Sequence, residues 1–239
     1  MVEQGRGIIG PVAPHAFSLV VFDVAGTTVL DGDIVIEAMD AALIAGGVTV
    51  GRDAARSVMG IPKPLAIARL LQLGNAVSQD SRVDRIHDDF LQRLRAQYQS
   101  HPSVREAEGA RETFRQLRQL GIKVALDTGF DRPTLDVLLT RLGWIVPDVL
   151  DCTVSSDEVI DGRPGPDLIR RAMQLTAVSD PRHVVKVGDT PSDLESGRSA
   201  GCGLVVGVSY GTHSRAELLR HHPSAVIDDL RALLPLIVG

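Results

Sequence analysis

The chain has 239 residues, of which 44% are hydrophobic and 23% are charged, and its formal net charge at pH 7 is -5. A chain of this length can bury the core of one large domain, or of a domain with a smaller one inserted. The negative charge, without a cluster of Lys or Arg, argues against a nucleic acid or an anionic membrane surface as the main partner and leaves small molecules.

Cysteine usage and the apolar segments favour a cytoplasmic protein. Cys152 and Cys202 lie far apart and lack the spacing of a disulfide framework or a zinc site. No stretch reaches the roughly 18 apolar residues of a membrane span, and residues 1–16 lack the apolar region of a signal peptide. We therefore expect no membrane partner and a flexible N-terminal tail over residues 1–16.

The first predicted element is a buried strand over the apolar run 17–24, which places Asp23 at its carboxyl end. In open α/β sheets, ligands bind beyond the carboxyl ends of the strands. Gly26 permits a tight turn with inward-pointing N–H groups, and Thr27 adds a hydroxyl, so this loop can hold a phosphate beside a carboxylate. An ordinary Asx turn is the alternative interpretation.

The segment 31–105 has the pattern of helices only. Asp33 can cap the first helix, and helical periodicity follows over 52–58, 64–73 and 83–98. Because no strand pattern interrupts these helices, we expect a separate all-helical domain inserted over the edge of the sheet.

From residue 106 onward, strands alternate with helices. The predicted strands lie at 122–126, near Val149, and at 184–187, 204–208 and 225–227. Such alternation is typical of right-handed crossovers in a parallel sheet. The sequence therefore predicts an α/β core formed by residues 17–30 and 106–239.

Polar residues follow three of these strands: Asp23 with Thr27, then Asp127 with Thr128 and Gly129, then Asp189 with Asp193. The carboxyl ends of parallel strands share one edge, so we expect the three clusters to face one crevice. Carboxylates in one crevice repel each other unless a cation joins them, and Mg²⁺ prefers such oxygen ligands. A helix cap is the alternative for the last cluster.

These residues resemble the motifs of the haloacid dehalogenase superfamily. Residues 23–27 resemble the first motif, Thr128 the second and residues 188–193 the fourth. The resemblance covers nearly the whole chain after the tail. It implies a Rossmann-like doubly wound core, an inserted cap over residues 31–105, Mg²⁺ and an aspartyl-enzyme intermediate.

The resemblance also implies a role for each matching position. Asp23 would be the nucleophile. The metal would be held by Asp23, Asp189 and the backbone carbonyl of Ala25, with Asp193 supporting the site. Substrate phosphate would be bound by Gly26, Thr27, Thr128, Gly129 and Arg163. Arg163 stands where the third motif normally has a lysine. Its guanidinium can still neutralise and clamp phosphate.

Position 25 departs from most phosphatases of the superfamily. They carry a second aspartate two residues after the nucleophile, as general acid for the leaving alcohol and then as base for water, whereas this chain has Ala25. Loss of such catalysis typically lowers a rate by about 10²- to 10⁴-fold. Alanine at this position resembles the phosphonatase-like branch, which also has arginine where Arg163 stands.

That branch carries a cap lysine in a Met-Gly-x-x-Lys context, which Met59 and Lys63 match. Cleavage of a carbon–phosphorus bond requires the carbon to leave as a stabilised carbanion. A neutral lysine amine that condenses with an adjacent aldehyde gives an iminium, which accepts those electrons. Only three of the 25 basic residues are lysines, and this scarcity favours the catalytic role over a solvated loop lysine.

Two positions differ from true phosphonatase. There a histidine follows the lysine by three residues and a tyrosine follows the glycine of the second motif, whereas this chain has Ala66 and Phe130. The resemblance is therefore to the phosphonatase-like sister group. It implies cleavage of phosphonoacetaldehyde or a related aldehyde phosphonate, in which Asp23 attacks phosphorus and Lys63 forms a Schiff base with the aldehyde. Desolvation in the cap would keep the Lys63 amine neutral. The resemblance also implies a homodimer formed through the cap.

Two alternatives remain open at this point. One is a small-metabolite phosphomonoesterase, similar to phosphoglycolate phosphatase, which manages without a second aspartate and without a Schiff base. The other is a non-catalytic protein that keeps the phosphate pocket only for binding.

Overall fold

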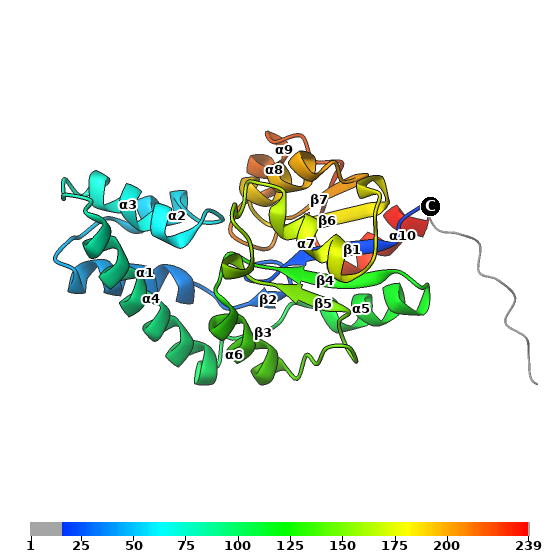
Figure 1. The fold of residues 1–239 in the computed structure, drawn as a ribbon, viewed down its shortest axis with the longest axis horizontal. Coiled ribbons are helices and arrows are strands. Elements are labelled where there is room, and N and C mark those ends of the chain that lie inside the picture. Colours follow the sequence, from blue (N-terminus) through cyan, green and yellow to red (C-terminus); the bar gives the residue numbers. More distant parts are fainter. Residues whose placement is uncertain (1–15, 239) are drawn as a thin grey trace, which may run out of the picture.

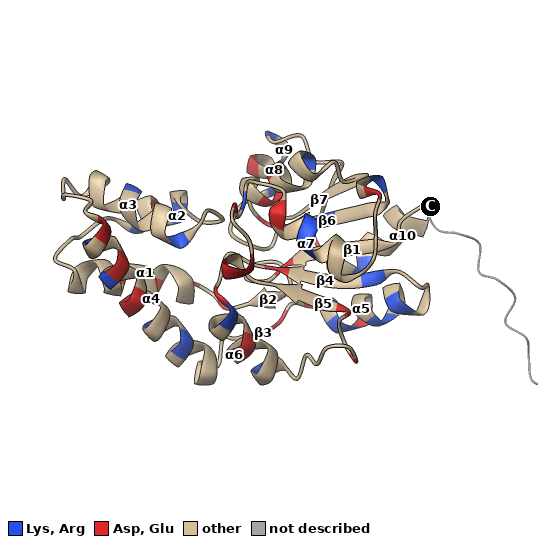
Figure 2. Ribbon diagram, viewed as in Figure 1, with Lys and Arg blue, Asp and Glu red and all other residues tan. Residues whose placement is uncertain are grey.

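The computed structural model describes residues 16–238 of the chain. All of the predicted tail, residues 1–16, lies outside this part except its last residue. A sheet with flanking helices forms one body, and a second group of helices lies to one side of it (Figure 1). Basic and acidic residues are interspersed over both groups (Figure 2). Among the described residues, no helix has the length and apolar character needed to cross a membrane.

The central sheet has six parallel strands in the order β5-β4-β1-β6-β7-β8. They are β1 (Leu19–Asp23), β4 (Lys123–Asp127), β5 (Cys152–Val154), β6 (Val184–Gly188), β7 (Leu204–Val208) and β8 (Ala225–Ile227). This confirms the predicted α/β fold with a doubly wound parallel sheet. The short strand expected near Val149 is present as β5, but it begins only at Cys152, because the N–H groups of Val149 and Leu150 turn back to the carbonyl of Ile145.

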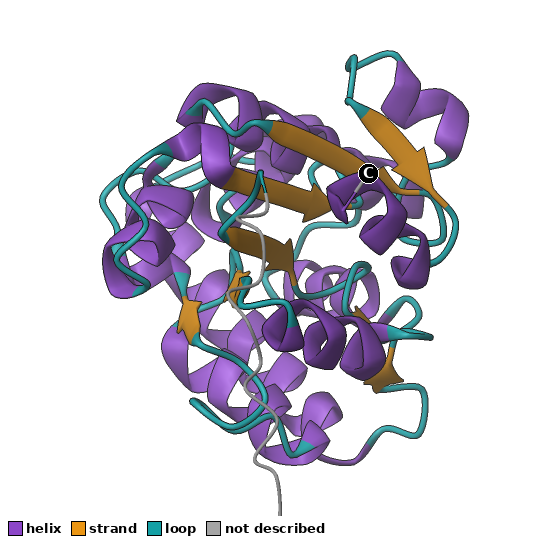
Figure 3. Ribbon diagram, turned by 90° about the vertical axis from the view of Figure 1, so that its right-hand side faces the viewer, coloured by secondary structure: helices purple, strands orange, loops and turns teal. Residues whose placement is uncertain are grey.

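Helices cover both faces of the sheet (Figure 3). They are α5 (Ala110–Gln119), α6 (Arg132–Leu142), α7 (Asp167–Leu175), α8 (Pro191–Ala200), α9 (Arg215–Leu219) and α10 (Leu233–Val238), with short 3-10 helices at Ser156–Glu158, Pro181–His183 and Leu230–Ala232. Successive side chains of a strand point to opposite faces. Val20 and Phe22 therefore join the cluster that includes α5 and α10, while Leu19 and Val21 pack with α7.

The second group of helices comprises α1 (Ile34–Ala45), α2 (Arg52–Ser57), α3 (Lys63–Leu73) and α4 (Asp80–Ser100). We call these four helices the helical unit. On α4, the apolar residues at four-residue spacing, from Ile86 to Tyr98, are buried. Asp33 occupies the N-cap of α1 without a side-chain cap hydrogen bond, because its carboxylate pairs with Arg52 and Arg56 instead.

A two-stranded antiparallel ribbon joins the helical unit to the sheet. It pairs β2 (Val29–Leu30) with β3 (Arg105–Glu106). The expectation of helices alone over 31–105 missed the first residue of β3, because a strand of two residues is too short to show alternation.

Candidate active site

The loop after β1 is built around the backbone of Val24. The N–H groups of Thr27, Thr28 and Val29 all point to the carbonyl of Val24, which folds the loop tightly beyond the strand end. Gly26 has φ of +88°, and a Cβ at this position would lie 2.3 Å from an oxygen of Asp189. Only glycine therefore permits the loop to approach that carboxylate.

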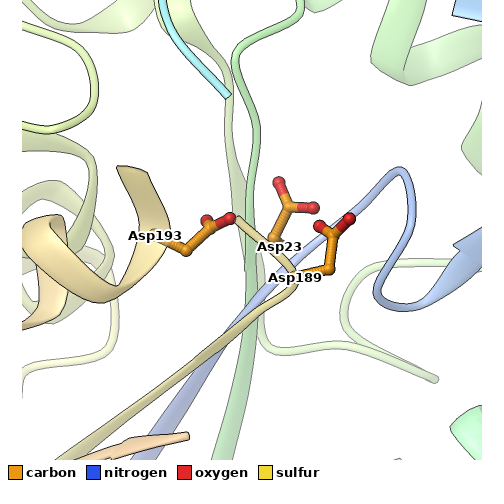
Figure 4. A group of neighbouring side chains, drawn as sticks. All are labelled: Asp23, Asp189 and Asp193. Atoms are coloured by element: carbon orange, nitrogen blue, oxygen red, sulfur yellow. The ribbon is translucent and has the colours of Figure 1, made fainter. Parts of the chain in front are cut away.

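Three buried carboxylates meet at this edge of the sheet (Figure 4). Asp23, Asp189 and Asp193 each offer an oxygen that lies within 4.8 Å of the others. Arg163 stands beside them, with Nη1 at 2.7 Å from Oδ1 of Asp23, and it also pairs with Asp193. The guanidinium thus bridges the carboxylates of Asp23 and Asp193.

Burial and mutual repulsion set the charges of this group. Burial, together with the charges of Asp193 and Asp189, raises the pKa of Asp23 to about 8 despite the attraction of Arg163. Burial and Asp193 also raise the pKa of Asp189. Burial alone would raise the pKa of Asp193 too, but Arg163 and Lys186 hold it below its ordinary value. The cations of the protein therefore neutralise the carboxylates of Asp23 and Asp189 only in part.

A pocket of about 380 Å³ opens above the carboxylates, between the sheet and the helical unit. Eight of the predicted site residues line it: Asp23, Ala25, Gly26, Met59, Lys63, Thr128, Gly129 and Arg163. The other three, Thr27, Asp189 and Asp193, are buried beneath it. The structure thus gathers residues from three strand ends and one helix of the helical unit around one cavity.

Lys63 is the first residue of α3 and only 7% exposed, so the interpretation as a solvated loop lysine is wrong. The loop before it approaches the sheet closely, since a Cβ on Gly60, which has φ of +83°, would lie 2.6 Å from Oγ1 of Thr190. Burial, and then the charge of Arg163, lower the pKa of Lys63 to about 8. A substantial fraction of its amine is therefore neutral near physiological pH.

A family model described as haloacid dehalogenase-like hydrolase matches residues 17–201. The chain belongs to the haloacid dehalogenase-like hydrolases. This family membership makes the protein a hydrolase and confirms the resemblance read from its motifs.

Proteins similar in sequence include members of two groups of these hydrolases. Phosphonoacetaldehyde hydrolase of Bacillus cereus is 33% identical over 207 residues, which cover 81% of this chain and 76% of that protein. Phosphoglycolate phosphatase of Pseudomonas syringae pv. tomato is 29% identical over 230 residues, covering 91% and 78%. A solved hydrolase from Pseudomonas syringae shares the fold, with a TM-score of 0.83 and 21% identity over 93% of this chain and all of that one.

Mg²⁺, which haloacid dehalogenase-like hydrolases generally use, fits the donors of this site. The carboxylates of Asp23 and Asp189 and the carbonyl of Ala25 offer the hard oxygen ligands that Mg²⁺ prefers. A divalent cation there would supply the positive charge that the raised pKa values of the two carboxylates call for. Asp193 would remain outside this set, because Arg163 and Lys186 already neutralise it.

Other residues of this hydrolase's site escaped the sequence reasoning. The loop after β7 contributes Tyr210, whose hydroxyl donates to the carbonyl of Thr27 at 2.7 Å. The same loop contributes Thr212, whose N–H donates to Oδ2 of Asp189 at 2.6 Å. These residues follow a strand of the same sheet, so the rule that identified the first three strand ends also applies to a fourth.

The expectation that Asp127 faces the phosphate crevice is wrong. Its carboxylate pairs instead with Lys186, a fully buried residue of β6 that also lies 3.2 Å from Asp193. Lys186 is in register with Val21, and Asp23 lies two residues further along β1, so these side chains share one face of the sheet. Asp127, Lys186, Asp193, Arg163 and Asp23 consequently form a continuous buried chain of alternating charges.

Replacing Lys186 with methionine is expected to lower the free energy of unfolding by about 3–5 kcal/mol, because it leaves the Asp127 carboxylate buried without its partner. Urea unfolding measures this loss through the midpoint of the transition. The double variant that also replaces Asp127 with leucine should recover much of the loss, since both charges of the pair are then absent. Equal losses in the single and double variants would contradict this account.

Proposed function

We propose that this hydrolase cleaves the carbon–phosphorus bond of phosphonoacetaldehyde or a related aldehyde phosphonate. The observation that carries the proposal is the buried Lys63 with its lowered pKa, which lines the same pocket as Asp23. Identity of 33% to a phosphonoacetaldehyde hydrolase supports it.

The chemistry divides between Lys63 and Asp23. The neutral amine of Lys63 attacks the aldehyde carbon and, after loss of water, forms an iminium next to the phosphonate carbon. Asp23 attacks phosphorus, the carbon–phosphorus bond breaks, and its electron pair enters the iminium to give an enamine. The enamine then takes up a proton at carbon, water hydrolyses the resulting iminium and frees Lys63, and a second water hydrolyses the aspartyl-phosphate and frees Asp23. For phosphonoacetaldehyde, the products are acetaldehyde and phosphate.

Arg163 and the strand-end loops bind the phosphoryl group in this proposal. The guanidinium lies against Asp23, where it can hold a phosphoryl oxygen during the attack. Thr128, whose hydroxyl can donate to a phosphoryl oxygen, and Gly129 line the same pocket. Ala25 also lines the pocket and cannot protonate an alcohol leaving group, so its presence suits a substrate that has none.

Borohydride trapping tests the proposal directly. The protein is incubated with phosphonoacetaldehyde and Mg²⁺, reduced with borohydride and mapped by peptide mass spectrometry. We expect a reduced adduct on Lys63. The exposed Lys123, whose side chain is 51% accessible, reports unspecific alkylation, and the buried Lys186 should stay unmodified. Phosphate release with an unmodified Lys63 would exclude the Schiff-base mechanism.

A phosphomonoesterase is the second candidate. Its support is the 29% identity to a phosphoglycolate phosphatase, which extends over 91% of this chain. In addition, Arg56 and Arg105 line the pocket, where they can receive the carboxylate of a substrate such as phosphoglycolate. This candidate predicts phosphate release from a phosphate ester that does not depend on Lys63.

A further inference from the structure

A second carboxyl group faces the pocket from the junction of the ribbon and the helical unit. Asp31 follows β2 directly, lines the pocket and is only 6% exposed. The hydroxyl of Tyr98, a fully buried residue near the end of α4, donates a hydrogen bond of 2.5 Å to Oδ2 of Asp31. The two residues are 67 positions apart in the chain, so this contact fixes the carboxyl group through the folding of the helical unit.

Asp31 and Lys63 line the same pocket, and the fully buried Tyr98 lies next to both Asp31 and Phe130. The ring of Phe130 joins them, since its centroid lies 6.0 Å from Nζ of Lys63 and 5.8 Å from the ring centroid of Tyr98. Neither Ala25 nor Phe130 can move a proton. Among the described residues that line the pocket, Asp31 is the buried carboxyl group besides Asp23, and it shares this cavity with Lys63.

The surroundings of Asp31 allow it to exchange a proton near neutral pH. Burial raises its pKa to about 6, although the hydrogen bond from Tyr98 opposes the shift. Lys63 from α3 also lowers this pKa and Asp189 from the sheet raises it. The other charged groups of the pocket wall are Asp23, Asp33, Arg56, Arg105 and Arg163. Burial raises the pKa of Tyr98 as well, so its phenol remains a donor.

We propose that Asp31 is the general acid and base for imine formation and hydrolysis at Lys63, and that Tyr98 is its positioning residue. The proposal rests on the Schiff-base function proposed above and extends it. It supplies the proton transfer that Ala25, Ala66 and Phe130 cannot provide.

Asp31 gives up one proton while the iminium forms and takes one back while the iminium is hydrolysed. When the carbinolamine on Lys63 loses its oxygen as water, the Asp31 carboxyl donates a proton to that oxygen, the carbon–oxygen bond breaks, and the nitrogen lone pair forms the iminium. The phosphoryl group then moves to Asp23, and solvent protonates the enamine carbon. The Asp31 carboxylate next takes a proton from the water that attacks the product iminium. The carbinolamine finally collapses to aldehyde and amine as its hydroxyl proton passes to nitrogen.

The test follows adduct formation on Lys63 with phosphonoacetaldehyde, quenched by borohydride at successive times. Asp31→Asn is expected to slow this step by about 10²- to 10⁴-fold. Asp33→Asn is the matched control, because Asp33 is a neighbouring carboxylate that lines the pocket and pairs with Arg52. Its rate should equal that of the wild type.

The pH profile separates a proton carrier from a structural role. The wild-type rate needs a neutral Lys63 and a protonated Asp31, so it should rise up to about pH 6, stay level to about pH 8 and then fall. Asp31→Asn should keep rising to about pH 8 and show no fall. Tyr98→Phe removes the hydrogen bond that lowers the pKa of Asp31, so the lower edge of the plateau should move to higher pH.

Asp31→Glu keeps a carboxyl group, so the rate of adduct formation should still fall above pH 8. This variant tests the role of the carboxyl group even if Asp31→Asn does not fold. If Asp31→Asn traps at the wild-type rate with the wild-type profile, the role of Asp31 is overturned and the Schiff base stands. If the wild type itself gives no adduct, both proposals are overturned.

Discussion

Replacing Lys63 with methionine is expected to lower the turnover of phosphonoacetaldehyde by more than about 10⁴-fold, the scale on which loss of a residue that forms a covalent intermediate lowers a rate. Methionine fills a similar volume in the buried position but has no amine, so the carbon cannot leave as an enamine. Whatever phosphate release the wild type shows from a phosphate monoester should persist in this variant, because Asp23 and Arg163 remain in place. The measurement is a phosphate-release assay on both substrates.

Two further variants interpret that result. Lys63→Arg keeps a cation but has no amine that condenses with an aldehyde, so it should be as inactive as the methionine variant on the phosphonate. Lys123→Met changes an exposed lysine at the start of β4 and should leave both activities intact. Equal losses on the phosphonate and the ester would mean that Lys63 serves general binding, and full phosphonate turnover in Lys63→Met would refute the Schiff base.

The residues at the edge of the sheet can be predicted from the sequence, because only the ends of the buried strands need to be located and not the contacts of their side chains. A buried parallel strand is an unbroken apolar run, and the residue at its end must lie at the common edge. The rule predicts that Asp23, Thr128 and Asp189 lie together, and the structure places them at or directly beneath one pocket. The motif context around Lys63 brought the helical unit to the same place, although nothing in its own segment indicates that the lysine is buried.

The missed contacts depend on which partners meet in three dimensions. Lys186 lies within an apolar strand, and its sequence does not show that Asp127 will neutralise it. The position of Asp127 at a strand end therefore predicts that it faces the crevice. In the structure its carboxylate instead lies beneath the crevice, because the buried Lys186 needs a counter-ion. The contact of Tyr98 with Asp31 likewise joins the end of α4 to the start of the helical unit. Periodicity along a helix predicts that Tyr98 is buried but not what its hydroxyl binds.

Replacing Asp23 with asparagine is expected to lower phosphate release by more than about 10⁴-fold with phosphonate and ester substrates alike, since both routes need the carboxylate that attacks phosphorus. The assay uses both substrates with Mg²⁺, and binding is followed separately by thermal shift with inorganic phosphate. If the protein is an enzyme, the Asp23→Asn variant loses turnover but still binds phosphate in a folded pocket. If it is only a binding protein, the wild type itself releases no phosphate from any member of a panel of phosphonates and phosphate esters.

The Asp23→Asn variant also tests whether the Asp23 carboxyl group takes up a proton on folding, through the pH dependence of its stability. The pKa of Asp23 is raised from 3.8 to about 8 in the metal-free folded protein, so between these values the native state binds more protons than the unfolded state, and stability falls as pH rises. The asparagine variant lacks this contribution. In chelator-treated protein, unfolding should therefore show wild-type stability declining more steeply than that of the variant from about pH 4 to pH 8. Parallel curves would mean that Arg163 alone satisfies the Asp23 carboxylate, and the case for a divalent cation at Asp23 and Asp189 would lose its electrostatic support.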